Sequence, residues 1–346
     1  MTGVTAYRLR RGRELTVTSA HSEASRPMRD MSCGATRPAR KEFPMNGIII
    51  LDKPSGFTSF DGVAVLRGLS HQKKIGHTGT LDPMATGVLP VLLGRAAKAL
   101  NFLPDTDKEY HAAFRLGERR DTGDITGEVV ETSSVPVSRE TLELVLPRFR
   151  GEISQVPPMY SAVSVGGKRL YELARKGLEV DRPARQVTVS ALELLSYDPQ
   201  TREGELLVRC SKGTYIRVLI EDLAAAAGTC GTMTALRRTR ACGFTLEDAH
   251  PLEELKQLAG EGKLEEVLLP VERLFSEFPQ VYVSPAQARR FENGGGLDLA
   301  RVRKAPEEGL CRVKSPEGVF LGLGRADRSK GELEFVKSFL EREEQK

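Results

Sequence analysis

The spacing of apolar and polar residues shifts between helical and extended periods along most of the chain. The run GIIILD at 47–52 predicts a buried strand, and TSFDGVAVLRGLS at 58–70 predicts a short capped helix. GVLPVLLG at 87–94 predicts another strand. Pro90 should place that strand near an edge or a bend, because proline cannot donate a ladder hydrogen bond.

The middle of the chain predicts longer strands separated by helices. The long extended stretches favour antiparallel pairing, so the expected fold class is α+β, with a mixed, largely antiparallel sheet flanked by helices. This pattern lacks the regular βαβ order of a doubly wound sheet. We expect helices at 95–103, 138–149 and 214–228, strands at 109–117, 185–198 and 204–213, and a hairpin over 118–132.

Three segments differ in pattern from this framework. Residues 1–44 show no sustained period, and we expect a disordered N-terminal extension or an extended start there, although a transit peptide has a similar arginine-rich composition. The segment 156–180 bears proline, glycine and basic residues between two predicted strands, which is typical of a surface insertion. Beyond about residue 276, short strands separated by Gly and Pro-Glu-Gly turns predict a small β-rich terminal domain.

Composition predicts a globular chain and weakens one hint of nucleic-acid binding. Of 346 residues, 40% are hydrophobic and 28% are charged, and no apolar run is long enough to cross a bilayer. The net charge of +4 arises in residues 1–44, which hold nine bases and four acids and leave 42 bases against 43 acids elsewhere. A nucleic-acid surface on the folded part must therefore be built from local basic patches.

Motifs for metals, cofactors and common covalent nucleophiles are missing from the sequence. The five cysteines are widely spaced, with no CxxC pair, which argues against zinc and disulfides and favours a reducing cytoplasm. No GK[ST], GxSxG or HExxH motif occurs. The stretch DTGDITGE at 121–128 fails the calcium-loop spacing, and a hairpin turn is the expected use of its residues. We therefore expect no metal, no cofactor and a cytoplasmic location.

The stretch KIGHTGTLDPMATGVLPVLLG at 74–94 holds one carboxylate, Asp82, among small residues. A lone carboxylate can act as a nucleophile or as a base on a carbon beside a ring oxygen, as in sugar chemistry. It needs a cation to hold it ionised once substrate excludes water, and Arg217 is the candidate beside an apolar helical face. Taken alone, Asp82 could instead cap a turn, and Arg217 could pair with Glu221.

The block GHTGTLDPMATGVLPV resembles the active-site motif of the bacterial TruB-type pseudouridine synthases, which isomerise uridine 55 in the T-loop of tRNA. Five further blocks resemble the same family, in the family's order, from Met45 onward. They are GIIILDKPSGFTS, DKEYHAAFRLGERRDTGD, QVPPMYSAV with GGKRLYELARKG, CSKGTYIRVLIEDL, and ALRRTRACGF. Chance would have to supply both the residues and their order, so the resemblance is specific.

The resemblance implies a role for each of several residues. Asp82 is identified as the catalytic aspartate, and Arg217 as its ion-pair partner. Tyr110 is implied to stack on the target base and to take part in proton transfer, with Tyr215 beside the arginine. Leu236 is implied to form the apolar wall of the uracil pocket. These five residues make up the expected centre of the site.

Other positions are implied to bind or support the RNA. His77 is similar to the residue that fills the gap left by the everted nucleotide. Lys53, in a short motif that supports the cleft, is grouped with the substrate-binding residues. Candidates for contacts with the RNA backbone are Lys73, Lys74, Lys168, Arg169, Arg237, Arg238 and Arg240.

The resemblance also implies a division into domains. Residues 45–275 correspond to the pseudouridine synthase catalytic domain, with a thumb-like insertion at about 152–182 that closes on the RNA. Family members often carry a lysine in the thumb where this chain has Ser164. Residues 277–343 are similar to a small PUA-like RNA-binding domain.

The implied reaction breaks the N1–C1′ bond of uridine, turns the uracil and joins C5 to C1′. Nothing is oxidised and no water is added, so neither a redox cofactor nor a metal is required. The implied partner is the T-arm of tRNA, without a membrane or an obligate protein partner. Two alternatives stay open: a tRNA-folding chaperone without catalysis, and a guide-RNA-dependent relative. Whether Asp82 attacks C1′ or removes a sugar proton also stays open.

Overall fold

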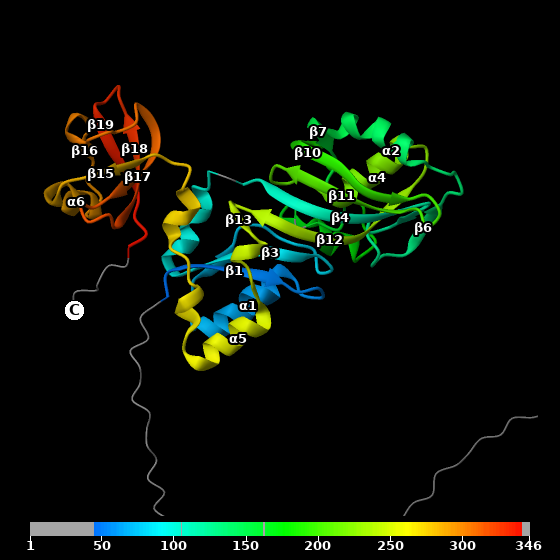
Figure 1. Cartoon of the computed structure of the whole chain (residues 1–346), viewed down its shortest axis with the longest axis horizontal. Helices are drawn as coiled ribbons and strands as arrows, with labels where there is room; N and C mark the ends of the chain where they lie inside the picture. The colour runs from blue at the N-terminus through cyan, green and yellow to red at the C-terminus, as the bar shows by residue number, and fades with distance from the viewer. Residues whose placement is uncertain (1–44, 105, 162, 341–346) are drawn as a thin grey trace, which may run out of the picture. The chain divides into compact units, whose positions relative to one another are not determined.

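The computed structural model describes residues 45–104, 106–161 and 163–340. The extension expected at 1–44 lies outside these residues, as do the last three positions of the terminal domain expected at 277–343. Two large sheets, one of ten strands and one of five, organise the described part (Figure 1). No helix within that part is long and apolar enough to span a membrane.

The larger sheet is mixed and largely antiparallel, as the sequence predicts. Its strand order is β14-β1-β3-β12-β4-β11-β10-β7, with β13 beside β12 and β2 beside β3. Among these pairs, β1 with β14 and β3 with β12 are parallel. The strands are β1 (Gly47–Lys53), β2 (Ile75–His77), β3 (Thr86–Leu93), β4 (Lys108–Leu116), β7 (Gly151–Gln155), β10 (Arg185–Asp198), β11 (Glu203–Cys210), β12 (Gly231–Ala241), β13 (Phe244–Thr245) and β14 (His250–Pro251).

Helices pack on both faces of this sheet. In β1, Ile49 and Leu51 face the apolar cluster that contains α1 and α5, whereas Ile48 and Ile50 face the cluster that contains η1 and η5. Farther along the sheet, α2 and α4 share a third cluster with β4, β10, β11 and β12. The helices are α1 (Ser59–Ser70), η1 (Gly94–Asn101), α2 (Arg139–Val145), η2 (Leu146–Phe149), α4 (Ile216–Ala226), η3 (Leu246–Asp248), α5 (Leu252–Glu261), η4 (Leu264–Val267) and η5 (Val271–Phe275).

Two local predictions differ from the structure. Pro90 lies in an interior strand, not near an edge, because β3 pairs with β1 on one side and with β2 and β12 on the other. Pro90 lies between Gly87, which pairs with β12, and Val91, which pairs with β2, and its carbonyl accepts the Thr78 N–H at 3.2 Å. The helix expected at 95–103 is a 3₁₀ helix, whose three-residue turn brings the buried Ala96 and Ala99 onto one face.

The predicted surface insertion leaves the sheet at its edge strand. It begins after β7, contains the hairpin β8 (Ser164–Val165) with β9 (Lys168–Arg169) and the helix α3 (Leu170–Ala174), and returns into β10. The hairpin expected over 118–132 also forms, from β5 (Glu118–Arg120) and β6 (Val129–Thr132). The hairpin follows β4, which the sequence pattern predicts, whereas no strand was predicted at β7, where the insertion begins.

The C-terminal sheet has its own core and is β-rich, as expected. Its strand order is β15-β17-β18-β19-β16. Leu323 and Phe339 also join Phe275 and Ile48 in one apolar cluster, so this sheet shares packing with the larger one. Its elements are β15 (Gln280–Tyr282), α6 (Pro285–Glu292), β16 (Leu297–Asp298), η6 (Leu299–Arg301), β17 (Glu308–Lys314), β18 (Phe320–Asp327) and β19 (Glu332–Lys337).

Candidate active site

The loop between β2 and β3 carries Asp82 and is held in place by hydrogen bonds to residues outside the loop. The hydroxyl oxygen of Ser59, at the start of α1, accepts the Leu81 N–H at 2.8 Å. The Pro83 carbonyl accepts the Gly56 N–H at 2.8 Å and the Lys53 ammonium at 3.3 Å. Hydrogen bonds on both flanks of Asp82 thus hold its backbone in place while its side chain faces a cavity.

A glycine is required where the loop enters the sheet. Gly87 has a φ of +103°, and a Cβ there would lie 2.2 Å from the Arg238 carbonyl oxygen. The close approach is the start of the parallel pairing between β3 and β12. Gly87 therefore serves a tight backbone crossing, which any larger side chain would push apart.

The cavity beside Asp82 has a volume of about 350 Å³. Its walls are the Asp82 loop, strands β4 and β12, residues Ser161 and Val163 of the insertion, and the start of α4. A volume of this order suits one nucleoside. The lining residues are Thr78, Gly79, Thr80, Leu81, Asp82, Lys108, Tyr110, Ser161, Val163, Lys212, Gly213, Thr214, Tyr215, Ile216, Arg217 and Leu236.

Asp82 and Arg217 form a two-pronged ion pair at this cavity. Arg217 Nε lies 3.0 Å from Asp82 Oδ2, and Arg217 Nη2 donates to Asp82 Oδ1 at 3.2 Å. The arginine side chain is 5% exposed, whereas the aspartate side chain keeps 32% of its surface exposed toward the cavity. Burial raises the pKa of the Asp82 carboxyl, and the guanidinium opposes that rise. The carboxylate is therefore held in one geometry with its outer face free to react.

A second carboxylate, missed by the sequence analysis, stands behind this pair. Asp124 Oδ2 lies 3.8 Å from Arg217 Nε, and its side chain is 7% exposed. Its Oδ1 accepts the hydroxyls of Thr122 at 3.0 Å and Thr126 at 2.5 Å. The interpretation of 121–128 as a hairpin turn was correct but incomplete. The two threonines spaced around Asp124 were the available signal, because they supply hydroxyl donors for a buried carboxylate.

Tyr110 and Leu236 contribute ring and apolar surface to the cavity. They come from the paired strands β4 and β12, and they are 6% and 7% exposed. Burial raises the pKa of the Tyr110 phenol to about 12, against the opposing charge of Arg238. The phenol therefore keeps its proton at neutral pH and can donate it. Tyr215, at the N-terminus of α4, lines the same cavity.

His77 ends β2 and lies immediately before the first lining residue. Its Nδ1 accepts the Gly79 N–H at 3.2 Å, so any proton of the neutral ring sits on Nε2. Burial, together with the nearby Arg238, lowers the pKa of this imidazole. At neutral pH the ring is therefore uncharged, which suits contact with a base more than contact with a phosphate.

Two sequence-based assignments need correction, because both side chains are fully buried. Lys53 is 0% exposed and donates to the Phe57 carbonyl at 2.5 Å as well as to Pro83, so it supports the Asp82 loop and does not touch substrate. Burial lowers the pKa of its ammonium to about 8. Arg238 is also 0% exposed and donates to the Val88 carbonyl at 2.7 Å, so it cannot reach an RNA phosphate.

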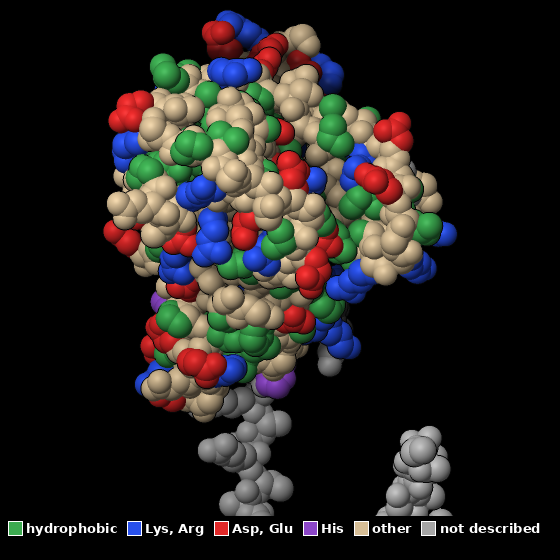
Figure 2. All heavy atoms as spheres, turned by 90° about the vertical axis from the view of Figure 1, so that its right-hand side faces the viewer, with side chains coloured by type: hydrophobic (Ala, Val, Ile, Leu, Met, Phe, Trp, Pro, Cys, Tyr) green, Lys and Arg blue, Asp and Glu red, His purple; other side chains and the backbone are tan. Residues whose placement is uncertain are grey.

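The other basic candidates remain at the surface, in separate places. Lys73 and Lys74 are exposed before β2, and Lys168 and Arg169 are exposed on the β8–β9 hairpin. Arg237 is 42% exposed but is paired with Asp52 at 2.8 Å. On the face shown in Figure 2, basic and acidic side chains are interspersed, in keeping with the balanced charge of the folded part.

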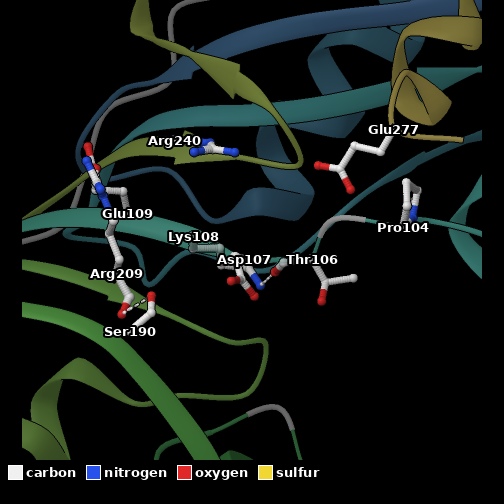
Figure 3. Close-up of a pocket in the computed structure, with 9 residues that line it drawn as sticks. All are labelled: Pro104, Thr106, Asp107, Lys108, Glu109, Ser190, Arg209, Arg240 and Glu277. Atoms are coloured by element: carbon white, nitrogen blue, oxygen red, sulfur yellow. Dashed lines mark hydrogen bonds and ion pairs between the residues drawn. The ribbon is translucent and has the colours of Figure 1, made fainter. Parts of the chain in front are cut away.

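Arg240 lies outside the cavity, in a neighbouring groove of about 380 Å³ (Figure 3). Lys108 lines both the groove and the cavity. Arg209 and Glu109 pair across the groove at 2.5 Å. Acids and bases alternate along its walls, so its field is mixed and does not single out an anion.

The site contains acid–base groups without a metal-binding cluster. No group of three or more His, Cys, Asp or Glu side chains within the described residues could hold a metal ion. The arrangement provides an ionisable carboxylate clamped by a guanidinium, a protonated phenol and an apolar wall. Such a set can trap a flat ring and bring a nucleophile or base to a carbon beside it.

Three family models match the chain in succession. The model for TruB family pseudouridylate synthase (N terminal domain) matches residues 67–216. The model for tRNA pseudouridylate synthase B C-terminal domain matches 217–276, and that for pseudouridine synthase II TruB, C-terminal, matches 279–333. Together the first two span every residue that lines the cavity.

Curated relatives agree with these models. A tRNA pseudouridine synthase B of Pseudomonas putida is 45% identical over 284 residues, which cover 81% of this chain and 91% of the relative. The protein of the same name from Pseudomonas aeruginosa is 43% identical over 283 residues, covering 81% and 91%. At this level of identity and coverage the relatives share one architecture with the chain.

Solved structures give the same architecture. A chain from a Cbf5–Nop10–Gar1 complex is similar with a TM-score of 0.66 and 26% identity, over 85% of each chain. A chain from an H/ACA RNP bound to a substrate RNA containing 2′-deoxyuridine is similar in fold, with a TM-score of 0.65, 24% identity and 86% coverage of each chain.

Proposed function

Because this chain belongs to the TruB family of pseudouridine synthases and forms pseudouridine in tRNA, we propose that its target is uridine 55 of the T-loop. We further propose that Asp82 carries the chemistry. The observation that supports this most directly is the Asp82–Arg217 ion pair, whose two contacts of 3.0 and 3.2 Å leave the carboxylate facing a nucleoside-sized cavity.

Asp82 acts on the ribose of the target nucleotide. It either attacks C1′ or removes a sugar proton, and in both cases the ionised carboxylate is the reactive form. The N1–C1′ bond breaks, the uracil turns while it stays bound, and C5 joins C1′ as Asp82 leaves C1′ or returns the sugar proton. The proton on C5 then passes to a base and N1 takes up a proton, so that the conjugated ring is restored and the product is an isomer of the substrate. Arg217 orients the carboxylate through its planar fork, which a lysine cannot reproduce.

Tyr110 and Leu236 hold the detached uracil. An aromatic ring and an apolar side chain contact the faces of a flat base without directional hydrogen bonds, so the base can rotate between them. The Tyr110 phenol keeps its proton because burial raises its pKa to about 12, so in this state it is a hydrogen-bond donor to the uracil; the proton that leaves C5 needs a separate acceptor.

The target base must first leave its stack, which costs a few kcal/mol. His77, uncharged and next to the cavity, fills the vacated space. The exposed bases on the insertion and before β2 hold the RNA backbone, while the folded shape of the T-loop selects the uridine. These bases are Lys73, Lys74, Lys168 and Arg169, with Arg240 in the adjoining groove.

A T-loop hairpin RNA tests the proposal. The purified protein is incubated with the hairpin alone, and pseudouridine is mapped chemically at each uridine. We expect modification at the position equivalent to 55 by the wild-type protein and none by Asp82→Asn. Product from Asp82→Asn at the wild-type rate would contradict the catalytic role of Asp82. Modification at another uridine would contradict uridine 55 as the target.

The same experiment separates the two alternatives. Binding of the hairpin without product from either protein would favour a tRNA-folding chaperone. Product that requires an added guide RNA would favour a guide-dependent enzyme. We expect product without a guide, because the insertion between β7 and β10 can close on the RNA itself.

A further inference from the structure

Gln155 is a buried amide with an unusual pair of contacts. It is the last residue of β7, at the point where the insertion leaves the sheet, and it is 2% exposed. Its Oε1 accepts the Tyr215 N–H at 2.9 Å, and its Nε2 donates to the Tyr215 carbonyl at 3.2 Å. One side chain thus satisfies both backbone groups of the residue at which α4 begins.

The same region makes a second contact with α4. The Tyr160 carbonyl, five residues beyond Gln155, accepts Arg217 Nη2 at 2.9 Å. That guanidinium nitrogen also donates to Asp82. The root of the insertion, residues 155–160, is therefore tied to the first turn of α4 at both of its ends, and one of those ties runs through the arginine that holds the catalytic carboxylate.

We propose that Gln155 is a positioning residue that couples the insertion to the Asp82–Arg217 pair. Its amide fixes the backbone of Tyr215, and Tyr215 begins the helical turn that carries Arg217 two residues later. When RNA settles against the insertion, the root and the arginine move as one unit. The inference rests on the proposed catalytic role of Asp82 and adds a residue that the family resemblance and the comparisons leave unassigned.

Hydrogen-bond chemistry explains why a glutamine suits this task. A primary amide presents an N–H donor and a carbonyl acceptor side by side, as a residue of an extended strand does toward its antiparallel neighbour, so it can bridge the N–H and C=O of a single residue. The Tyr215 carbonyl already accepts the Leu219 N–H of α4 at 3.0 Å. Gln155 uses the remaining acceptor site and satisfies an N–H that would otherwise be left at the helix start.

Replacing the amide by a carboxyl group gives a pH-dependent test. In Gln155→Glu, the ionised side chain still accepts the Tyr215 N–H but directs a negative oxygen at the Tyr215 carbonyl. The protonated form restores a donor, and burial raises the pKa of a carboxyl group at such a site. We expect the single-turnover rate, measured with enzyme in saturating excess over T-loop hairpin, to fall about tenfold at alkaline pH and to recover toward wild type at acid pH.

Gln186→Glu is the matched control. Gln186 is exposed on β10 and pairs with Ser154, next to Gln155 in the sheet. The control places the same new charge one position away without touching α4. Its rate relative to wild type should stay constant across the pH range. If both variants show the same pH dependence, or if Gln155→Glu shows none, the coupling is wrong.

A double-mutant cycle tests whether Gln155 acts through Arg217. In the wild-type background, Gln155→Ala should lower the rate about tenfold. In the Arg217→Lys background, the same substitution should lower the rate by less than about threefold, because the arginine fork is already lost there. Equal effects in both backgrounds would overturn the proposal. If Gln155→Ala does not fold, the recovery of Gln155→Glu at acid pH decides the question. Absence of product from the wild-type protein would instead reject the proposed function, so the two failures are distinct.

Discussion

Two arginine–aspartate forks in this protein have similar contact distances and very different surroundings. Arg217 holds Asp82 beside the cavity, and Arg237 holds Asp52 with contacts of 2.8 and 3.3 Å. The Arg217 side chain is 5% exposed and the Arg237 side chain is 42% exposed. An ion pair exposed to water is screened and contributes little to stability, whereas a desolvated ion pair holds both charged side chains in place.

The backbone around each fork widens the difference. Arg217 also donates to the carbonyls of Thr122 and Tyr160, at 2.8 and 2.9 Å, so three segments of the chain converge on one guanidinium. Arg237 makes its further contact with the Thr86 hydroxyl, at 3.3 Å. A pair that organises several backbone segments can set the geometry of a reaction, whereas the Asp52–Arg237 pair only links the side chains of β1 and β12.

The largest effect is expected when the carboxylate of each fork is neutralised. Asp82→Asn should lower the single-turnover rate at least about a thousandfold, since the group that meets the ribose is lost. The isosteric Asp52→Asn, at the exposed fork, should change the rate no more than about threefold. Rates are compared on T-loop hairpin at saturating enzyme. A comparable loss in both variants would show that the comparison of the two forks is mistaken.

A smaller but still large effect is expected when each arginine becomes lysine. Arg217→Lys should lower turnover about ten- to a hundredfold, because a single ammonium cannot occupy two carboxylate oxygens and two carbonyls at once. Arg237→Lys keeps its charge near Asp52 and should alter turnover less than about threefold. Unchanged turnover in Arg217→Lys would argue against the fork as the element that orients Asp82.

The pH dependence of the rate probes the second carboxylate at the buried fork. Asp82 must be ionised to react, so the rate should fall as the pH drops through the pKa of this carboxyl. Burial raises that pKa above its usual value, and the negative charge of Asp124 raises it further. Asp124→Asn removes a neighbouring negative charge and should lower the pKa of Asp82, moving the acid limb to lower pH. Asp52→Asn, which removes the carboxylate of the other fork, serves as the control. An acid limb that stays in place would reject the coupling.

The smallest effect concerns stability. Removing the exposed fork with Asp52→Asn should reduce the free energy of unfolding by less than about 1 kcal/mol, since surface pairs of this kind typically contribute 0 to 1 kcal/mol. Urea unfolding followed by circular dichroism gives this value, and addition of salt should shrink it further. A loss of several kcal/mol would mean that the fork is effectively desolvated despite its exposure.

Much of the framework follows from local sequence pattern. The strand at 47–52, the helix after Thr58 and the strand around Tyr110 all form where periodicity predicts them, whereas β12, which carries Leu236, was not predicted. Thr58 is a true N-cap, whose side chain accepts the Asp61 N–H. These features depend on a few neighbouring residues, so a linear reading can recover them.

The composition of the candidate site was only partly readable. Asp82, Tyr110, Tyr215, Arg217 and Leu236 were expected together, and all five line one cavity. Asp124 was read as a turn residue because its threonine contacts are local, while its contact with Arg217 crosses the fold. Gln155 gave no signal at all, since its partner lies sixty positions away along the chain.

The adjacent residues Arg237 and Arg238 show where sequence alone stops. The sequence marked both arginines as candidates for contacts with the RNA backbone, but it predicted no strand at 231–241, where side chains point alternately to opposite faces. It could not establish which face would be covered. Only the packing of β12 against β3 and the Asp82 loop left Arg238 fully buried against backbone carbonyls and Arg237 in solvent. The desolvation of a charged side chain depends on atoms far away in the chain. The tertiary structure therefore decided how strongly Arg237 and Arg238 each interact with their partners.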